Sequence, residues 1–444
     1  MKSMSETVIQ PESLSEEYPR RPIKQPLYWL GGIAILSAAL RVALVLRGSR
    51  LGQNYWPDEG RILRTWVVLK LLMLHKPGEA LNYILHIEPY TPSHWFYTIL
   101  AIPFALVQAA YMRLLHVPLD TETVKFYLWV MALGTCLFSV ASIVLVYMIA
   151  KRTGASEYVS LAAAFFTAAS TTMFYYSRHL FPYDAGMALA LLALWIGLKQ
   201  GSLSRSFASG LIAGLAFSTY NGCWQMAGIA LVVHTLYFRP TFMEWLKRSL
   251  VAGSGLVLPY ALIEVLARVR GLPSYIFGMR GFMGAEIMGS FDEGWKFPAM
   301  YLWDCERLIL IVWIVLAVVA IRRSWLWLSL ALGTYLFLAL PSHLQVVPVY
   351  GRTARQIVPF LCLAAAFGLA RLPKRVSAAV VVLVVVLFAI NIAVPFRQHF
   401  PPFLGPNDPH PLTWRPYQEE NFPPQVRAAF RRGDYSWWFA KGMK

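Results

Sequence analysis

The acidic pair Asp58 and Glu59 is the feature of this sequence with the clearest chemical potential. It lies in the segment NYWPDEGRIL, shortly after the apolar stretch WLGGIAILSAALRVALVL. Charged side chains beside a lipid bilayer are costly, so they are rarely kept there without a function. Adjacent carboxylates next to Tyr55 and Trp56 suit the binding or deprotonation of a hydroxyl group at a membrane surface. The alternative is an ordinary solvated turn.

A second acidic candidate, Asp184, follows the segment YYSRHLFPY at the start of another apolar stretch. Asp is a favoured residue at a helix N-cap, and the same carboxylate could position a substrate, so both roles are open. Arg178 precedes it closely enough to pair with that acid or to bind a phosphate. The aromatic residues of this segment are expected to anchor the chain at the membrane interface. They are Tyr175, Tyr176 and Tyr183.

A pair of arginines, Arg352 and Arg355, begins a further apolar stretch in the segment YGRTARQ. Residues at positions i and i+3 lie on one face of a helix, so both side chains are expected to point the same way. Planar guanidinium groups bind phosphate well, and a helix N-terminus favours an anion. The alternative is contact with ordinary lipid headgroups.

Other polar clusters have simpler expected roles. An internal ion pair is expected among Asp304, Glu306 and Arg307 in the segment LWDCERL. His94 and Tyr97 lie in the segment HIEPYTPSHWFY, whose histidine and acid spacing does not match a zinc site. We interpret this segment as loop structure or acceptor contacts. The four cysteines have no metal-ligand spacing and are expected to be inert apolar side chains.

The elements that must hold these residues are membrane helices. The sequence is 57% hydrophobic and 14% charged, whereas soluble domains are roughly 45–50% apolar and about 25% charged. An all-α polytopic membrane protein is therefore predicted. The net charge of +17 comes from Lys and Arg in short links between apolar runs. Because no basic soluble face results, nucleic acid is excluded as a partner.

The charge pattern also predicts a topology. About eleven stretches approach the roughly 20 residues that a span requires, and the basic links place the N-terminus inside and the C-terminus outside. Residues 94–116 are also apolar, but counting them would reverse the later links, so they are assigned to a re-entrant or interfacial helix on the outer surface. Arg352 and Arg355 then lie at the outer surface, against the usual trend, which favours an anionic partner. The spans are expected to begin near Leu27, Val124, Tyr158, Tyr183, Ser206, Gly222, Ser249, Tyr301, Trp325, Thr353 and Val376.

The domain organisation follows from this topology. Residues 1–26 form a cytoplasmic segment, and residues 27–395 form the membrane domain. Within it, residues 48–123 form a long first extracytoplasmic loop that contains interfacial helices. Residues 396–444 form an extracytoplasmic tail. The first apolar stretch, 27–47, is expected to be a retained anchor, because a secretory signal starts with a short basic segment.

The order of these features resembles the integral-membrane glycosyltransferases of the GT-C fold. The resemblance rests on PDEGR in a long first loop, YTPSHWFY, the basic AKRTG, FYYSRHLFPYDAG and YGRTARQIVPFLCLAAAFGLA. It is strongest towards the branch of protein O-mannosyltransferases and lipid A aminoarabinose transferases. The resemblance implies a GT-C-like fold, with Asp58 as general base, Asp184 positioning a substrate, and Arg352 and Arg355 binding the donor phosphate. The other expected substrate contacts are Glu59, Arg178, His94 and Tyr97.

The function that the resemblance implies is transfer of a sugar from a polyprenyl-phosphate donor to a hydroxyl or amine. The acceptor is an unidentified glycan, lipid or protein, and membrane lipids surround the enzyme. Inversion by a single displacement is expected, because no second carboxylate is placed as a nucleophile. No cofactor is expected. A divalent metal at Asp58, Glu59 and Asp184 is conceivable but not favoured, because arginines can neutralise a phosphate.

The expected location is a bacterial cytoplasmic (inner) membrane, with the active site on its extracytoplasmic face. The alternative function is a transporter or flippase of a lipid-linked or small anionic substrate. Transporters usually bind substrates at broken helices near the bilayer midplane, often between repeated halves. No internal repeat is visible in this sequence, which favours the enzyme. A membrane protein with only a structural role would not require the acidic pair in a long loop.

Overall fold

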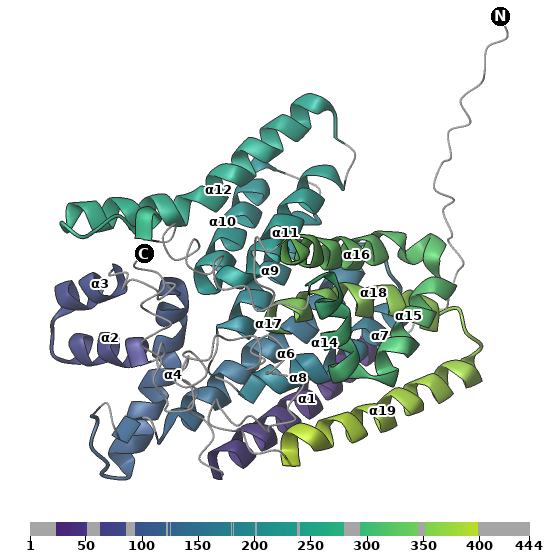
Figure 1. Cartoon of the computed structure of the whole chain (residues 1–444), viewed down its shortest axis with the longest axis horizontal. Coiled ribbons are helices and arrows are strands. Elements are labelled where there is room, and N and C mark those ends of the chain that lie inside the picture. Colours follow the sequence, from purple (N-terminus) through teal and green to yellow (C-terminus); the bar gives the residue numbers. More distant parts are fainter. Residues whose placement is uncertain are drawn as a thin grey trace, which may run out of the picture.

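The structure of the chain is a computed structural model in which all regular elements of the described part are helices (Figure 1). The described residues are 24–50, 63–85, 94–120, 123–124, 126–178, 180, 182–199, 202–237, 240–278, 294–344 and 351–397. The predicted all-α class is confirmed for these residues. The tail from residue 398 onward and the acidic pair Asp58 and Glu59 lie outside them.

The described helices are divided by position in the chain into those before and those after residue 200. The first group comprises α1 (Lys24–Arg50), α2 (Leu63–Met73), α3 (Pro77–Leu85), α4 (Trp95–Leu114), α6 (Leu128–Arg152), α7 (Glu157–Ala168), α8 (Thr171–Tyr175), η2 (Tyr176–Arg178) and α9 (Tyr183–Gly197). The second comprises α10 (Leu203–Thr219), η3 (Asn221–Cys223), α11 (Trp224–Leu236), α12 (Phe242–Val269), η4 (Gly294–Lys296), α14 (Phe297–Glu306), α15 (Leu308–Val319), α16 (Ile321–His343), α17 (Gly351–Ala354), η5 (Arg355–Ile357), α18 (Val358–Leu369) and α19 (Lys374–Arg397).

Six helices of the described part are long and apolar enough to cross a membrane, namely α1, α4, α6, α12, α16 and α19. Shorter apolar helices include α7, α9 and α15. The chain is therefore a polytopic helical membrane protein. Helix α4 is among the six by length and composition, although the charge pattern assigned its residues to the outer surface.

Several stretches that the sequence predicts as continuous spans are broken. Helix α7 ends before Ser170, whose side chain accepts a hydrogen bond from the amide of Met173 and so starts α8. Between α14 and α15, Arg307 has a φ of 50°, which interrupts the helix. The stretch expected from Thr353 passes from α17 through the 3₁₀ turn η5 into α18. Apolar periodicity alone does not reveal such breaks, because the apolar residues continue on both sides.

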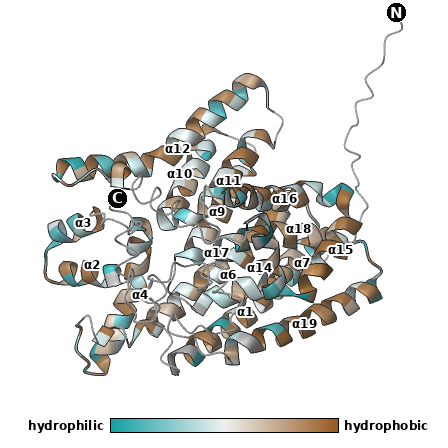
Figure 2. Cartoon of the chain, in the orientation of Figure 1, coloured by the Kyte–Doolittle hydropathy of each residue, from teal (hydrophilic) through white to brown (hydrophobic). Residues whose placement is uncertain are grey.

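The helices differ greatly in burial. Helix α9 packs against α6, α10 and α11, and α18 packs against α7, α15 and α16, so both lie inside the bundle. Helices α19 and α12 lie along opposite edges (Figure 1). Only 17% of the apolar window of α19 is buried, compared with 56% for α6. Helix α19, which is mostly brown in Figure 2, therefore exposes hydrophobic side chains on a surface suited to contact lipid.

The basic links contact the ends of neighbouring helices, and α3, in the segment predicted as the first loop, contacts the C-terminal end of α12. Near the C-terminal end of α6, Nη1 of Arg152 donates to the carbonyl oxygen of Trp195 at 2.9 Å. Similarly, Nη1 of Arg371 donates to the carbonyl oxygen of Val319 at 3.3 Å. Helix α3 instead meets the residue after α12, where Nε of Arg270 donates to Oδ1 of Asn82 at 2.7 Å. This contact lies at the opposite end of α12 from its basic first turns.

Glycines let the backbones of α10 and α12 touch. A Cβ atom on Gly210 would lie 1.9 Å from the carbonyl oxygen of Ala252, and one on Gly255 would lie 2.3 Å from that of Phe207. The neighbouring Gly253 has nothing within 4 Å of the equivalent position. Small residues at helix contacts are a general device of membrane proteins, because close approach strengthens van der Waals packing.

We expect Gly255→Ala to destabilise the protein by about 1–3 kcal/mol, because the new methyl group has to push the two backbones apart. Gly253→Ala is the matched control. It adds the same methyl group two positions earlier, where nothing lies within 4 Å of the new atom. The substitution should therefore be neutral, or stabilising by up to about 1 kcal/mol through helix propensity. Thermal unfolding in detergent measures both. Equal effects of the two substitutions would disprove the role assigned to this contact.

Candidate functional site

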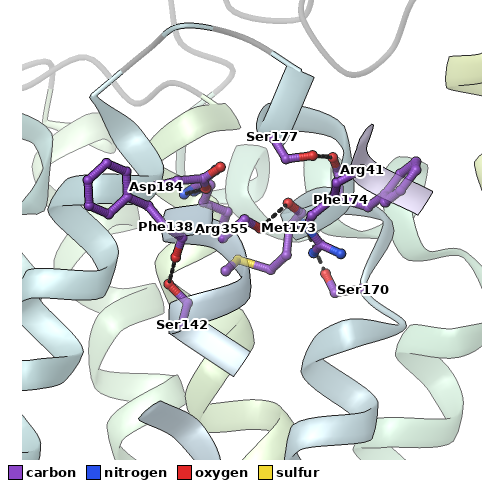
Figure 3. A network of polar contacts seen from close by, with 10 residues as sticks. Arg41, Phe138, Ser142, Ser170, Met173, Phe174, Ser177, Asp184 and Arg355 are labelled. Carbon is purple, nitrogen blue, oxygen red and sulfur yellow. Dashed lines mark hydrogen bonds and ion pairs between the residues drawn. The ribbon is translucent and has the colours of Figure 1, made fainter. Parts of the chain in front are cut away.

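The centre of the candidate site is a buried ion pair between Arg355 of η5 and Asp184 of α9 (Figure 3). The guanidinium Nη2 donates to Oδ1 of the carboxylate. Arg355 is 1% exposed and Asp184 is 5% exposed. The guanidinium carbon also lies 5.2 Å from the centre of the Tyr176 ring. An ion pair buried among apolar helices depends on both partners, because either charge alone would be left unsolvated.

A second buried arginine, Arg41 of α1, belongs to the same cluster (Figure 3). Its Nε donates to Oγ of Ser139 at 2.9 Å, and its Nη1 donates to the carbonyl oxygen of Ser37 at 3.2 Å. The guanidinium lies within electrostatic range of Asp184 and Arg355. Sequence analysis missed Arg41, although an arginine within the apolar stretch SAALRVALVL is itself a signal of function.

Both arginines retain an unused hydrogen-bond donor. Within the described residues, Nη2 of Arg41 and Nη1 of Arg355 are buried and have no hydrogen-bond partner. Buried polar groups are normally satisfied, so such donors call for an explanation. Among the described residues, the two guanidinium groups share one acidic neighbour, the carboxylate of Asp184. This cluster of side chains therefore carries one excess positive charge.

The carboxylate of Glu306 has a different role from the expected one. It is fully buried and accepts hydrogen bonds from Oγ of Ser170 at 2.6 Å and from the amides of Thr171 and Thr172, each at 2.9 Å. Glu306 is therefore engaged by α8, and the part of the predicted ion pair that concerns Asp304 and Arg307 stays a prediction. The first amides of a helix have no acceptor within it, and this carboxylate satisfies those of α8. Glu306 thus fixes the break that precedes the arginine cluster.

The predicted location of three tyrosines is also wrong. Tyr175, Tyr176 and Tyr183 are all buried, at 0%, 6% and 5% exposure, instead of lying at the lipid interface. The reason is that α8 and η2 are enclosed by α1, α6, α14 and α19. The hydroxyl of Tyr301 in α14 donates to that of Tyr176 at 3.1 Å. These rings form an aromatic wall next to Arg355.

The aromatic wall continues towards the first loop and brings two predicted residues to the site. The Tyr183 ring lies 4.6 Å from the Tyr220 ring, which lies 5.7 Å from that of His94, as measured between centroids. His94 is buried at the start of α4. The hydroxyl of Tyr97 donates to the carbonyl oxygen of Leu180 at 3.1 Å, beside the segment that leads to Asp184.

The structure brings some predicted site residues together and leaves others undescribed. Asp184 and Arg355, far apart in sequence, are in direct contact. The N-cap of α9 is Pro182, so the N-cap role considered for Asp184 is wrong; its carboxylate is in the first turn and pairs with Arg355. Arg178 lies in η2 and Arg352 in α17, but their side chains lie outside the described part.

No metal centre is present among the described residues. They contain no group of three or more His, Cys, Asp and Glu side chains that could hold a metal ion. The four cysteines are buried and form no disulfide. The conceivable cation site at Asp58, Glu59 and Asp184 includes residues outside the described part and stays a prediction.

The described cluster offers positive charge and unpaired hydrogen-bond donors, which are the groups that suit an anion. Comparison of the chain with family models and with curated proteins finds no match. The functional argument therefore rests on the residues themselves. Two buried guanidinium groups, one shared carboxylate and two unused donors form an electropositive site within a helical membrane protein.

Proposed function

We propose that this protein is an inverting glycosyltransferase with a GT-C-like arrangement of about eleven spans. It moves a sugar from a polyprenyl-phosphate donor to a hydroxyl or amine of a glycan, lipid or protein acceptor. The reaction takes place at the extracytoplasmic face of a bacterial cytoplasmic membrane. The observation that carries the proposal is the buried cluster of Arg41, Arg355 and Asp184, which has an excess positive charge.

The cluster supports a lipid-phosphate substrate because of where its residues come from. Arg41 belongs to a long apolar helix, and Arg355 precedes a nearly fully buried one. Guanidinium groups in low-dielectric surroundings bind phosphate oxygens strongly, since water does not screen the charge. A donor that brings its phosphate on a lipid tail reaches such a site from the membrane. A nucleotide sugar would instead need a soluble binding domain.

The topological part of the proposal is supported by contacts at the two ends of the bundle. The basic links contact one another's helices through Arg152 and Arg371. The first-loop helix α3 contacts Arg270 at the far end of α12 from Lys247 and Arg248. The positive-inside rule then assigns the basic links to the cytoplasm and the first loop to the other side.

The proposed chemistry is a single displacement. The carboxylate of Asp58 accepts the proton of the acceptor hydroxyl while the acceptor oxygen attacks the anomeric carbon. The bond between that carbon and the phosphate oxygen breaks, and the polyprenyl phosphate leaves with the electron pair. Arg352 and Arg355 stabilise the negative charge that develops on the leaving phosphate. Because attack occurs opposite to the leaving group, the configuration of the sugar inverts.

The proposal is tested with membranes that contain the protein and radiolabelled polyprenyl-phosphate sugars of several kinds. We expect at least one donor to transfer its label to a membrane or periplasmic acceptor, with release of the polyprenyl phosphate. Membranes without the protein give the background, and nucleotide sugars should not be used directly. If no donor in the panel is consumed above background, the proposed activity is rejected.

One observation favours a second candidate, a transporter or flippase. The helices break at Ser170 and at η5, beside the charged cluster, and broken helices are typical of transporter binding sites. Sealed vesicles distinguish the two functions. A transporter would move a fluorescent lipid-linked sugar across the bilayer with the sugar–phosphate bond intact, whereas the proposed enzyme breaks that bond.

A further inference from the structure

We propose that Arg41, from the first apolar helix, supplies a second guanidinium group to a phosphate-type anion that also binds Arg355. The pattern of motifs does not assign this role to Arg41, and the inference rests on the proposed function only for its choice of lipid. The ligand class is a phosphodiester on a lipid chain. Arg41 and Arg355, which both lie next to the α8–η2 segment, would each donate hydrogen bonds to the same phosphate.

The first argument is the position of the two guanidinium groups. That of Arg41 lies 5.6 Å from the centre of the Phe174 ring, and that of Arg355 lies 5.2 Å from the centre of the Tyr176 ring. Phe174, in α8, and Tyr176, in η2, are two positions apart in the same short segment. Ser139, which holds Nε of Arg41, donates to the carbonyl oxygen of Met173 in that segment at 3.3 Å. Both arginines therefore lie next to side chains of the same short segment.

The second argument is the pair of unused donors. Nη2 of Arg41 and Nη1 of Arg355 are buried without a hydrogen-bond partner in the described part of the chain. The side chains that carry them are 0% and 1% exposed, so bulk water does not satisfy them. A tetrahedral phosphate offers several acceptor oxygens and can accept from two guanidinium groups at once. A neutral ligand would leave the charges of the cluster unbalanced.

The third argument is the charge balance. Arg41 and Arg355 together carry two positive charges, and Asp184 supplies one negative charge. The carboxylate of Glu306 is taken up by the first amides of α8 and pairs with neither arginine. Among the described side chains of this cluster one positive charge is left over, which a singly charged phosphodiester neutralises. A buried arginine without a carboxylate of its own is costly in a membrane protein, and a bound anion removes that cost.

The experiment measures binding of three probes to the full-length protein in detergent. Binding is detected by titration and by the shift in the temperature of thermal unfolding. The probes are methyl farnesyl phosphate, which is a singly charged phosphodiester without a sugar, farnesol, which lacks the phosphate, and inorganic phosphate. The variant is Arg41→Met. The matched control is Arg47→Gln, which removes an exposed arginine from the same helix. A lipid-phosphate site predicts binding of methyl farnesyl phosphate alone, and a free-phosphate site predicts equal binding of inorganic phosphate.

We expect Arg41→Met to weaken binding of methyl farnesyl phosphate by about tenfold or more, because a charge-assisted hydrogen bond is lost. The Arg47→Gln protein should bind as the wild type does. Without a ligand, the Arg41→Met protein should unfold at the same temperature as the wild type or a higher one, because an uncompensated buried charge is replaced by an apolar side chain. An arginine that served only the fold would give the opposite result.

Three outcomes overturn the inference: unchanged binding by the Arg41→Met protein, equal loss in the Arg47→Gln protein, or an Arg41→Met protein that does not fold. The last outcome assigns Arg41 to structure. Failure of the proposed function is a separate result. If no sugar is transferred but methyl farnesyl phosphate binds through Arg41, the anion site stands without the enzyme activity. If sugar transfer is observed and the Arg41→Met protein retains full binding, the activity stands and this site does not.

Discussion

Neutralising one member of the Asp184–Arg355 pair should destabilise the protein much more than neutralising both. Asp184→Asn leaves Arg355 buried beside Arg41 without the carboxylate it pairs with, and Arg355→Gln leaves Asp184 without its hydrogen-bonded cation. Loss of one partner from a buried ion pair costs about 3–5 kcal/mol, because the remaining charge is not solvated. The double variant Asp184→Asn, Arg355→Gln removes both charges and should recover much of this loss. Unfolding in detergent measures each variant.

The control for this cycle is the exposed ion pair between Lys76 and Glu79, whose side chains are 51% and 57% exposed. Glu79→Gln should change stability by less than about 1 kcal/mol, because water screens the pair. Additive effects of the two substitutions in the buried pair would contradict the assignment. Additivity would mean that Asp184 and Arg355 contribute independently and that the ion pair does not organise the junction of α9 and η5.

The architecture of the chain was predictable where apolar composition decides it. The predicted start of a span at Tyr183 is the first residue of α9, and the start predicted near Val376 lies within the first turn of α19. The breaks were not predictable in the same way. Glu306 accepts hydrogen bonds from Ser170 although 136 positions separate them, and only the folded chain brings such residues together. The local sequence around Ser170 or around Glu306 does not indicate this hydrogen bond.

The candidate site was predictable residue by residue but not as an arrangement. Asp184 and Arg355 were each assigned to substrate binding because of their charge and their position at the ends of apolar stretches. Their direct pairing was not expected, because Arg178 is much nearer in sequence to Asp184. An interpretation of the first apolar stretch as an anchor alone gives Arg41 no role. An arginine inside an apolar stretch that is long enough to span a membrane is the signal that would have identified it.

Replacement of Asp58 should have the largest effect on activity. Asp58→Asn keeps the size and the hydrogen-bonding capacity of the side chain but removes the base, so turnover should fall about 10²–10⁴-fold. Asp58 lies outside the described residues, and the expectation therefore rests on the segment WPDEGR and on the proposed mechanism. Glu59→Gln is the matched control, because it removes the neighbouring charge from a residue expected only to orient a substrate. Its effect should be markedly smaller.

The measurement has to separate lost chemistry from lost binding. Transfer of radiolabelled sugar gives the turnover of each variant, and binding of methyl farnesyl phosphate to the same preparations reports the anion site independently. If Asp58 is the general base, the Asp58→Asn protein binds this probe as the wild type does, since the arginines that hold the phosphate are intact. Turnover within a few-fold of the wild type would remove Asp58 from the mechanism. Loss of probe binding together with turnover would instead assign Asp58 to the structure of the site, because a base that acts only on the acceptor has no contact with the donor phosphate.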